Sequence, residues 1–466
     1  MVASGPWKAR LRAAHATDFL WSICGRRGRA RAIEPVIKHL SSFGVKTILD
    51  YSAEEDVPEE EEVREDVRAE AERNKEESCY LARADGNSPL RRYQQSTDFA
   101  DRRKYLPVAR TYFYHGESQC ERNLETFFKS IEAVAQTTGN TGFAAIKLTA
   151  LGRPRLLMKL SKIIDYMRSV EGCARPDSLF DLLKRFNQLD QRDINRLDED
   201  EEEMFFNLMR RVNRIAAYAS QVGGARCMID AEQTYMQPAI NMIAMELMRA
   251  YNRREPIIFN TYQCYLKSAY DQERARAAKL GYEDPINESF EATTRMYERT
   301  LAYLMGEIER ELKLAAAIGE GEGTSDAGGD KLQPADANQQ EAELGANSRR
   351  ISIMVASHNE ETVRFAFEQM ERRGIKPWHR LICFGQLYGM CDHISFMLGQ
   401  SGYSVYKYAP YGPIEEVLPY LGRRAIENHG FLDKLERERQ LLAREIVARL
   451  GSLKLFYKPV GNYKTA

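Results

Sequence analysis

A short turn joins an apolar run to a helical pattern in the stretch FAAIKLTALGRPRLLMKLSKIIDYMR, residues 143–168. The run Phe143–Ala150 contains one charge, Lys147, and is typical of a strand that is buried on both faces. Pro154 suits the first turn of a helix, and the amphipathic pattern continues to Arg168. A buried strand followed at once by such a helix predicts a βα unit, from which parallel sheets are built.

Similar units recur along the chain. Six further runs predict strands: Val45–Asp50, Ala225–Asp230, Pro256–Gln263, Ser352–Ser357, Arg380–Gln386 and Tyr403–Tyr408. Helical patterns alternate with them: Pro154–Arg168, Glu201–Ser220, Gln237–Tyr251, Ser289–Leu314, Glu360–Arg372 and Pro413–Asn428. The alternation predicts an α/β fold with a parallel sheet. Seven strands are one fewer than a closed eightfold barrel requires.

The composition is that of a globular protein with a core, because 43% of the 466 residues are hydrophobic and 29% are charged. The 67 basic and 68 acidic residues nearly cancel, so no overall field favours nucleic acid. No apolar stretch approaches the roughly 20 residues that cross a bilayer, and any membrane contact is expected to be peripheral. The 8 cysteines form no Cys-x-x-Cys pair, which argues against zinc ribbons and thioredoxin-like chemistry.

Three segments differ in composition from the rest. Residues 1–40 form a basic N-terminal region, whose first 32 residues carry seven basic side chains against one acid; this pattern suits either mitochondrial import or an ordinary basic helix. An acidic insert spans 54–77, and a low-complexity linker spans 319–347. We therefore expect one barrel domain over 41–466 that carries both inserts.

Polar residues stand where most of the predicted strands end. They are Lys147, Asp230, Gln263, the triplet Ser357-His358-Asn359, Gln386 and Tyr408. In βα barrels the carboxyl ends of the strands converge at one mouth, where active sites lie. Lys147 and Asp230 could pair across neighbouring strands or hold other charges. No metal-ligand cluster, P-loop or Ser-His-Asp set stands out, so we expect no metal.

The last helical pattern follows the strand that ends at Tyr408. Tyr420, Arg423 or Arg424, and Glu427 share one face of it. Two adjacent guanidinium groups can clamp a carboxylate through forked hydrogen bonds. The alternative is a surface set of salt bridges.

Several long motifs resemble the proline dehydrogenase family of animal mitochondria. They are AAIKLTALGRP (144–154), MIDAEQTYMQPAI (228–240), FNTYQCYLK (259–267), IMVASHNEETVRFA (353–366), CFGQLYGMCDHISF (383–396) and YKYAPYGPIEEVLPYLGRRAIENHG (406–430), with SFGVKTILDYSAEED (42–56) and LFYKPVGNY (455–463) at the two ends. The resemblance implies a distorted (βα)8 barrel of the TIM type, with a helical N-terminal region, that holds FAD noncovalently.

The resemblance also implies roles for individual residues. Two arginines would hold the carboxylate of proline, and two tyrosines would flank its ring. The positions that match the substrate site are Lys147, Asp230, Tyr408, Tyr420, Arg423 and Arg424. Glu54 matches an acid that pairs with one of the arginines. The positions that match contacts to FAD are Gln263, Ser357, His358, Asn359 and Glu427.

The activity that the resemblance implies is oxidation of L-proline to 1-pyrroline-5-carboxylate. Electrons would pass to a membrane quinone, through peripheral contact with the matrix side of the inner mitochondrial membrane. Hydroxyproline dehydrogenase activity is the alternative within the family, although Tyr408 would crowd a ring hydroxyl. A catalytically silent barrel that regulates a complete isoform is the alternative from another class.

One segment departs from the family pattern. In the family, a helix and a fifth barrel strand follow YQCYLK, and an arginine at the end of that strand lies against the flavin. Here Lys267 is followed almost directly by Ala269 and Tyr270, and Gln263 and Tyr270 are seven residues apart. A parallel crossover needs about ten to twelve residues. We therefore expect a gap in the barrel, and weak or absent activity in this form.

Overall fold

The computed structural model describes residues 33–51, 116–138, 141–171, 178–188, 196–222, 225–234, 236–253, 255–266, 287, 289–321, 351–412, 417, 421 and 432–453. The acidic insert 54–77, the basic residues 1–32 and most of the linker 319–347 lie outside these ranges.

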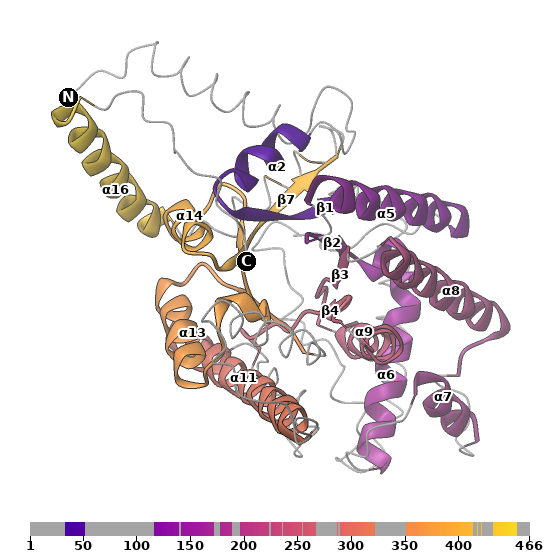
Figure 1. Ribbon diagram of the computed structural model, residues 1–466. Coiled ribbons are helices and arrows are strands. Elements are labelled where there is room, and N and C mark those ends of the chain that lie inside the picture. The colour runs from indigo at the N-terminus through magenta and orange to yellow at the C-terminus, as the bar shows by residue number, and fades with distance from the viewer. Residues whose placement is uncertain are drawn as a thin grey trace.

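Seven parallel strands form one curled sheet within the described residues (Figure 1). They are β1 (Val45–Tyr51), β2 (Phe143–Ile146), β3 (Arg226–Ile229), β4 (Ile258–Asn260), β5 (Ile353–Ala356), β6 (Ile382–Leu387) and β7 (Ser404–Tyr411). Their order is β4-β3-β2-β1-β7-β6-β5. The first and last strands pair along seven residues, from Val45 opposite Val405 to Tyr51 opposite Tyr411. Each of the seven predicted strands is confirmed, and so is the α/β barrel class.

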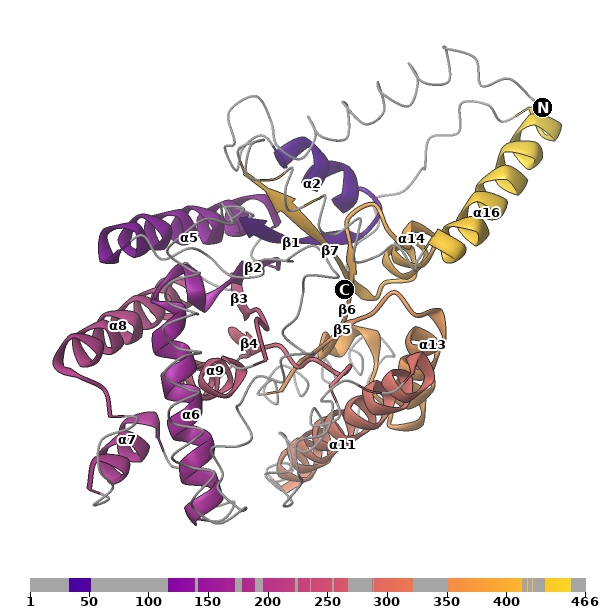
Figure 2. The same cartoon turned by 180° about the vertical axis from the view of Figure 1, so that it is seen from behind.

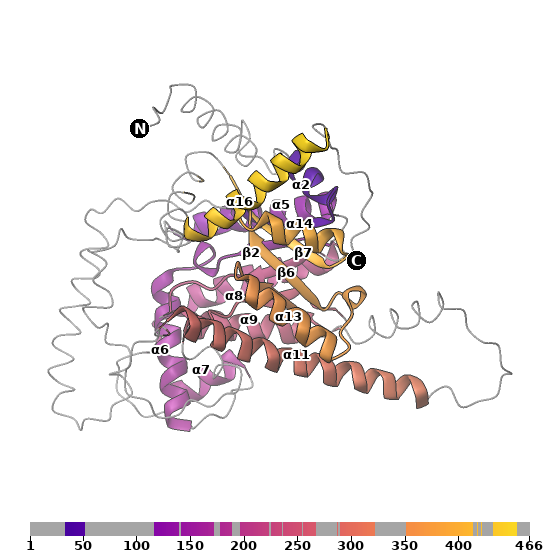
Figure 3. The same cartoon turned by 90° about the vertical axis from the view of Figure 1, so that its left-hand side faces the viewer.

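The described ranges also contain helices, most of which cover the outside of the curl. They are α2 (Glu34–Ser41), α5 (Glu117–Thr138), α6 (Pro154–Glu171), α7 (Leu179–Gln188), α8 (Glu199–Gln221), α9 (Gln237–Tyr251), α11 (Phe290–Gly321), α13 (Glu360–Arg372), α14 (Asp392–Gln400) and α16 (Leu432–Gly451). Figures 1 and 2 show α5, α6, α8 and α9 outside the half of the curl that contains β1 to β4, and α11, α13 and α14 outside the half that contains β5 to β7. In Figure 3, α11 and α13 lie side by side along its outside. None of the helices in the described ranges is long and apolar enough to cross a membrane.

Strand alternation divides the core into two layers. Outward residues such as Leu49, Ala144 and Ile229 pack with the helices in one large cluster. Inward residues form a smaller cluster inside the curl: Ile48, Phe143, Ala145, Met228, Phe259, Cys383 and Tyr406. Successive strand residues point to opposite faces, so the run of buried residues in each strand supplies both layers. Burial on both faces is the pattern that Phe143–Ala150 predicted.

The sheet is open between β4 and β5. β4 pairs with β3 alone, and β5 pairs with β6 alone. This is the place where the sequence lacks the helix and fifth strand of the family pattern, so the expected gap is confirmed for the described residues. Residues 267–286, which follow β4 in the sequence, lie outside the described ranges.

Some predicted boundaries are wrong. The strand predicted over Phe143–Ala150 ends at Ile146, and Leu148–Ala150 form a 3-10 turn. Side chains from other elements donate hydrogen bonds to the backbone oxygens of this turn. The strand predicted over Pro256–Gln263 shortens to Ile258–Asn260, because it has one neighbour instead of two. Helix α11 continues to Gly321, inside the predicted linker, because the run ELKLAAAI consists mostly of strong helix formers.

Candidate active site

Four polar side chains meet at the carboxyl ends of β1, β2 and β3 and beside the middle of β7, which continues past the predicted end at Tyr408 to Tyr411. The Lys147 Nζ lies 2.9 Å from Asp50 Oδ1 and 3.3 Å from Asp230 Oδ2. The Tyr408 hydroxyl donates a hydrogen bond to Asp230 Oδ2 at 2.8 Å. Each of the four stands two residues beyond a member of the inner apolar cluster, so strand alternation directs it into the curl. The structure therefore brings together three residues that the sequence singled out, and Lys147 and Asp230 pair across neighbouring strands.

The charges of this cluster do not balance. One ammonium group, Lys147, faces two carboxylates, and its side chain is 9% exposed. Burial raises the pKa of Asp230; the charge of Lys147 opposes this shift, and the charge of Asp50 adds to it. Within the described residues, the two buried acids Asp50 and Asp230 add negative potential at the mouth of the curl, and Lys147 offsets part of it.

Asp50 is a member of this cluster that the sequence analysis missed. It was the last residue of a predicted strand, and no function was assigned to it. The signal was present, because an acid that closes a buried apolar strand is the same feature that singled out Asp230. Its side chain is 2% exposed and bonds Lys147 more closely than Asp230 does.

A third buried acid, Glu232, lies beside the cluster. Its Oε1 accepts the backbone N–H of Thr149 at 3.1 Å, and its Oε2 accepts a hydrogen bond from the Thr149 hydroxyl. Burial raises the pKa of Glu232 to about 7, although the bonds from Thr149 and the charge of Lys147 oppose the shift. The sequence analysis did not single out Glu232 or Thr149, because both lie past the strand ends.

The residues that match contacts to FAD are divided between the two edges of the sheet. On the β5 side, His358 Nε2 accepts the backbone N–H of Leu387 at 3.0 Å, so the neutral ring carries its proton on Nδ1. Asn359 caps α13 by accepting the Glu361 N–H at 3.2 Å, and Ser357 Oγ accepts the Asn359 N–H at 3.1 Å. These bonds fix the turn after β5 locally, without help from β4.

On the β4 side, Gln263 is held by its amide nitrogen alone. Its Nε2 donates to the backbone oxygen of Glu232 at 2.9 Å. Its Oε1 is buried and accepts no hydrogen bond from the described residues, and the same holds for Oδ1 of Asn260. Buried acceptors without donors are costly. Two such oxygens therefore mark the β4 edge as a place where a donor group is needed.

Five of the predicted site residues lie outside the described ranges. They are Glu54, Tyr420, Arg423, Arg424 and Glu427. Their roles stay predictions.

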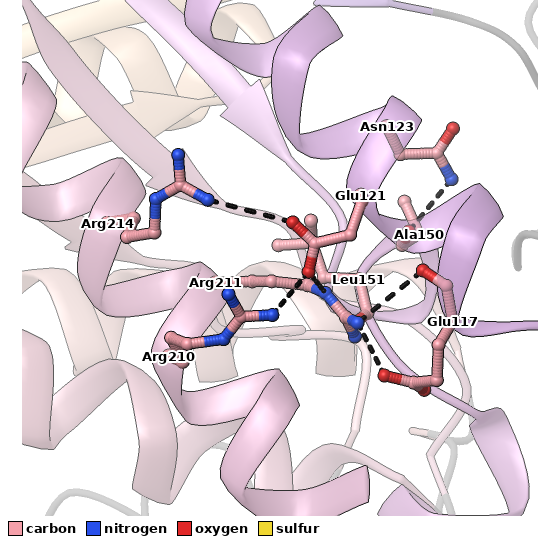
Figure 4. Close-up of polar contacts among 8 residues, drawn as sticks. All are labelled: Glu117, Glu121, Asn123, Ala150, Leu151, Arg210, Arg211 and Arg214. Atoms are coloured by element: carbon pink, nitrogen blue, oxygen red, sulfur yellow. Dashed lines mark hydrogen bonds and ion pairs between the residues drawn. The ribbon is translucent and has the colours of Figure 1, made fainter.

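The turn that carries Lys147 is anchored from outside by Arg211 of α8 (Figure 4). Its Nη1 donates to the backbone oxygen of Leu151 at 2.9 Å, its Nε lies 2.8 Å from Glu121 Oε1, and its Nη2 pairs with Glu117. Asn123 Nδ2 donates to the backbone oxygen of Ala150 at 2.8 Å. These side chains satisfy the backbone of the turn, which explains why the predicted strand stops at Ile146.

Replacing Arg211 by alanine is expected to destabilise the protein by about 3 kcal/mol, because it removes the partner of two carboxylates and of a buried carbonyl. The side chain of Arg211 is 1% exposed, whereas that of Arg210 is 52% exposed and contacts Glu121 only at the surface. Arg210→Ala is the control and is expected to cost less than about 1 kcal/mol. Urea unfolding measures both, and equal losses in the two variants would contradict the role given to Arg211.

Two stretches of the chain, residues 35–272 and 269–437, match the family model described as proline dehydrogenase. The stretches meet at residues 269–272, where the sequence departs from the family pattern. "Proline dehydrogenase 1, mitochondrial" of Drosophila melanogaster is 41% identical over 528 residues, covering 92% of this chain and 72% of that protein. The alignment is longer than the 466 residues of this chain, so the fly protein has residues inside the matched region that this chain lacks.

Two further relatives and one solved structure are also similar to this chain. The human "Proline dehydrogenase 1, mitochondrial" is 37% identical, covering 92% of this chain and 79% of that protein. "Hydroxyproline dehydrogenase" of Xenopus laevis is 33% identical, covering 72% of this chain and 68% of that protein. The crystal structure of proline utilization A (PutA) from Bdellovibrio bacteriovorus, inactivated by N-propargylglycine, aligns at 13% identity with a TM-score of 0.49, covering 91% of this chain and 34% of that one. The family match spans most of the chain, and we conclude that the chain belongs to the proline dehydrogenase family.

Proposed function

We propose that the chain is an FAD-dependent dehydrogenase that oxidises L-proline to 1-pyrroline-5-carboxylate. The observation that carries this proposal is the cluster of Asp50, Lys147, Asp230 and Tyr408 at the mouth of the curl in a member of this family. In its described part, the cluster combines two carboxylates and one ammonium group with an aromatic wall. A ring that bears a cationic amine fits such a place.

The cluster accounts for one end of proline, and the last helix would account for the other. The negative potential around Lys147 attracts the ring ammonium, while Arg423 and Arg424 would hold the carboxylate by forked hydrogen bonds. Tyr408, whose hydroxyl is held by Asp230, presents a fixed ring face, and Tyr420 would flank the opposite side. Glu54 would pair with one of the arginines. Binding at both ends of a small zwitterion fixes its orientation.

The chemistry needs the ring nitrogen to lose a proton before the carbon next to it loses a hydride. Deprotonation frees the nitrogen lone pair, which forms the carbon–nitrogen double bond of the product as the hydride leaves. Asp230 is suited to hold that proton, because burial raises its pKa. FAD, when bound, supplies the acceptor for the hydride. The chain otherwise orients the substrate and excludes water.

The described residues near β4 and β5 fit a flavin. Gln263 Oε1 and Asn260 Oδ1 are buried acceptors that receive no hydrogen bond from the described part of the chain, and a flavin ring carries N–H groups. Ser357, His358 and Asn359 supply polar atoms from the other edge, and Glu427 would add a contact from the last helix. These residues would hold FAD across the open part of the sheet.

The relatives are named either proline dehydrogenase or hydroxyproline dehydrogenase, so two substrates have to be weighed. The relatives named proline dehydrogenase are 37% and 41% identical, whereas the one named hydroxyproline dehydrogenase is 33% identical over a smaller share of the chain. The Tyr408 hydroxyl is fixed by Asp230 at 2.8 Å and cannot swing aside without losing that bond. A ring hydroxyl on the substrate would therefore meet a rigid wall. We favour proline.

The open edge between β4 and β5 favours a second candidate function, a catalytically silent barrel that regulates a complete isoform. Unpaired backbone groups at such an edge are costly beside a cofactor. For either function we propose a mitochondrial location, since the relatives are named mitochondrial. Peripheral contact with the matrix side of the inner membrane and transfer of electrons to a quinone complete the proposal for the enzyme.

Turnover with a dye as electron acceptor tests the proposed function. We expect L-proline to reduce the dye at least about tenfold faster than hydroxyproline, because the fixed Tyr408 ring penalises a substrate hydroxyl by more than about 1.4 kcal/mol. Each assay should contain added FAD, so that weak cofactor binding does not hide activity. Faster turnover of hydroxyproline would select the alternative substrate. No turnover of either compound by folded chain with bound FAD would select the silent barrel.

A further inference from the structure

The turn after β2 and the turn after β3 are joined by one carboxylate. Thr149 follows Lys147 by two residues, and Glu232 follows Asp230 by two residues. Both oxygens of Glu232 are used on Thr149, one for its backbone N–H at 3.1 Å and the other for its hydroxyl. The link therefore runs parallel to the ion pair of Lys147 and Asp230, and close to it in the chain.

The backbone of Glu232 is held from two further elements. Its N–H donates to Gln237 Oε1 of α9 at 3.0 Å, and its carbonyl oxygen accepts from Gln263 Nε2 at 2.9 Å. The residue is 1% exposed. A carboxylate that is buried and fixed at both its backbone and its side chain can hold a neighbouring turn at a defined distance.

We propose that Glu232 is a positioning residue, which clamps the turn after β2 to the turn after β3 and thereby sets the distance between Lys147 and Asp230. The inference rests on the proposed function in one respect, because the pair that Glu232 positions is the proposed site for the amine of proline. The backbone at Lys147 is extended and begins the 3-10 turn Leu148–Ala150. A shift of Thr149 would therefore move the Lys147 ammonium directly.

The charge state of Glu232 makes the clamp sensitive to pH. Its folded pKa of about 7 lies above the ordinary value of 4.5, so the carboxyl ionises as the pH rises through neutrality. The charged groups that face it are Lys147 and Asp230, and the other contacts, from Thr149, Gln237 and Gln263, are neutral. Ionisation adds negative potential beside a site that binds a cation, so affinity for the amine should increase from pH 6 to pH 8.

The first test needs no ligand. The coupling between Lys147 and Asp230 is measured by urea unfolding of Lys147→Met, Asp230→Asn and the double variant, first in the full chain and then with Glu232→Ala. We expect the coupling to fall to less than half in the Glu232→Ala background. Glu246→Ala is the matched control, because Glu246 of α9 also accepts a backbone N–H, that of Leu179, but at another place in the fold. An unchanged coupling with Glu232→Ala overturns the proposal, whatever happens to overall stability.

The second test measures L-proline binding to the full chain by calorimetry. Glu232→Ala is expected to raise the dissociation constant about tenfold, since a misplaced binding group loses affinity of this order. Glu232→Gln keeps the size and can still bond Thr149, so it should bind within about twofold of the unaltered chain at pH 6 and lose the increase towards pH 8. Binding by Glu232→Ala that matches the unaltered chain counts against the proposal. If the unaltered chain binds no proline, the proposed function fails, and the unfolding cycle still decides the role of Glu232.

Discussion

The purified chain is expected to bind FAD about 10 to 100 times more weakly than a variant that carries the missing crossover helix and strand. The family pattern places an arginine of that strand against the flavin, and one charge-assisted hydrogen bond contributes about 1.5 to 3 kcal/mol. Here the residues that match FAD contacts stand on two edges, β4 and β5, that do not pair. An edge of unpaired backbone groups adds to the loss.

The graft takes the segment of the Drosophila melanogaster relative that corresponds to the junction at residues 267–270. Flavin absorbance after gel filtration, and titration of the apoprotein with FAD, measure the retained cofactor. A graft of equal length with the strand arginine replaced by glutamine separates the lost cation from the lost strand pairing. Equal FAD affinity in the unaltered chain and the graft would show that the gap does not impair the cofactor site.

The two halves of the proposed site differ in how the strands support them. The amine site is built on four strands that pair continuously with one another. Asp50 lies in β1 and Tyr408 in β7, while Lys147 and Asp230 directly follow β2 and β3. Gln263 and the triplet at 357–359 stand on opposite edges of the opening. The gap is therefore expected to weaken the cofactor half and to leave the amine site formed. This division is why retention of FAD and binding of proline should be measured separately.

The sequence predicted the parts of the fold that local patterns encode. A strand buried on both faces appears in the sequence as a continuous apolar run. A polar residue at the end of such a run indicates the mouth of a barrel. This reasoning located Lys147, Asp230 and Tyr408. The same reasoning applied to the run that ends at Asp50 would have added the fourth member. The unfinished barrel was also visible, because Gln263 and Tyr270 are only seven positions apart and so short a connection cannot form a crossover.

The contacts that the sequence could not reveal join residues far apart in the chain. Arg211 lies in a charged helical pattern that is typical of a solvent-exposed helix face. Its burial depends on contacts with Leu151 and with Glu117 and Glu121 of another helix. Thr149 and Glu232 are separated by 83 positions and meet because β2 and β3 are neighbours. No local pattern distinguishes such residues from ordinary loop residues. Their role follows from the packing.

Lys147→Met is expected to destabilise the folded chain by about 3 to 5 kcal/mol at pH 8, the largest effect of a single substitution proposed for this molecule. Methionine fills a similar volume but leaves Asp50 and Asp230 facing each other without a cation. Binding of L-proline should also be lost, because the two carboxylates would no longer be held in place. The matched control is Lys159→Met, which breaks an ion pair between α6 and α8 whose lysine side chain is 23% exposed. That variant should lose less than about 1 kcal/mol.

The pH dependence of the Lys147→Met effect identifies its cause. Burial and the charge of Asp50 raise the pKa of Asp230, and the substitution removes the Lys147 charge that opposes this shift. An acid whose folded pKa is raised contributes to the free energy of unfolding at low pH, where it is protonated. This contribution is lost as the pH rises through the folded pKa. The deficit of Lys147→Met against the unaltered chain should therefore shrink between pH 8 and pH 5, and adding Asp50→Asn should recover about half of it at pH 8. A deficit that stays constant with pH would mean that lost packing, and not unpaired charge, causes it, and the cluster would then not hold the surplus negative charge on which amine binding depends.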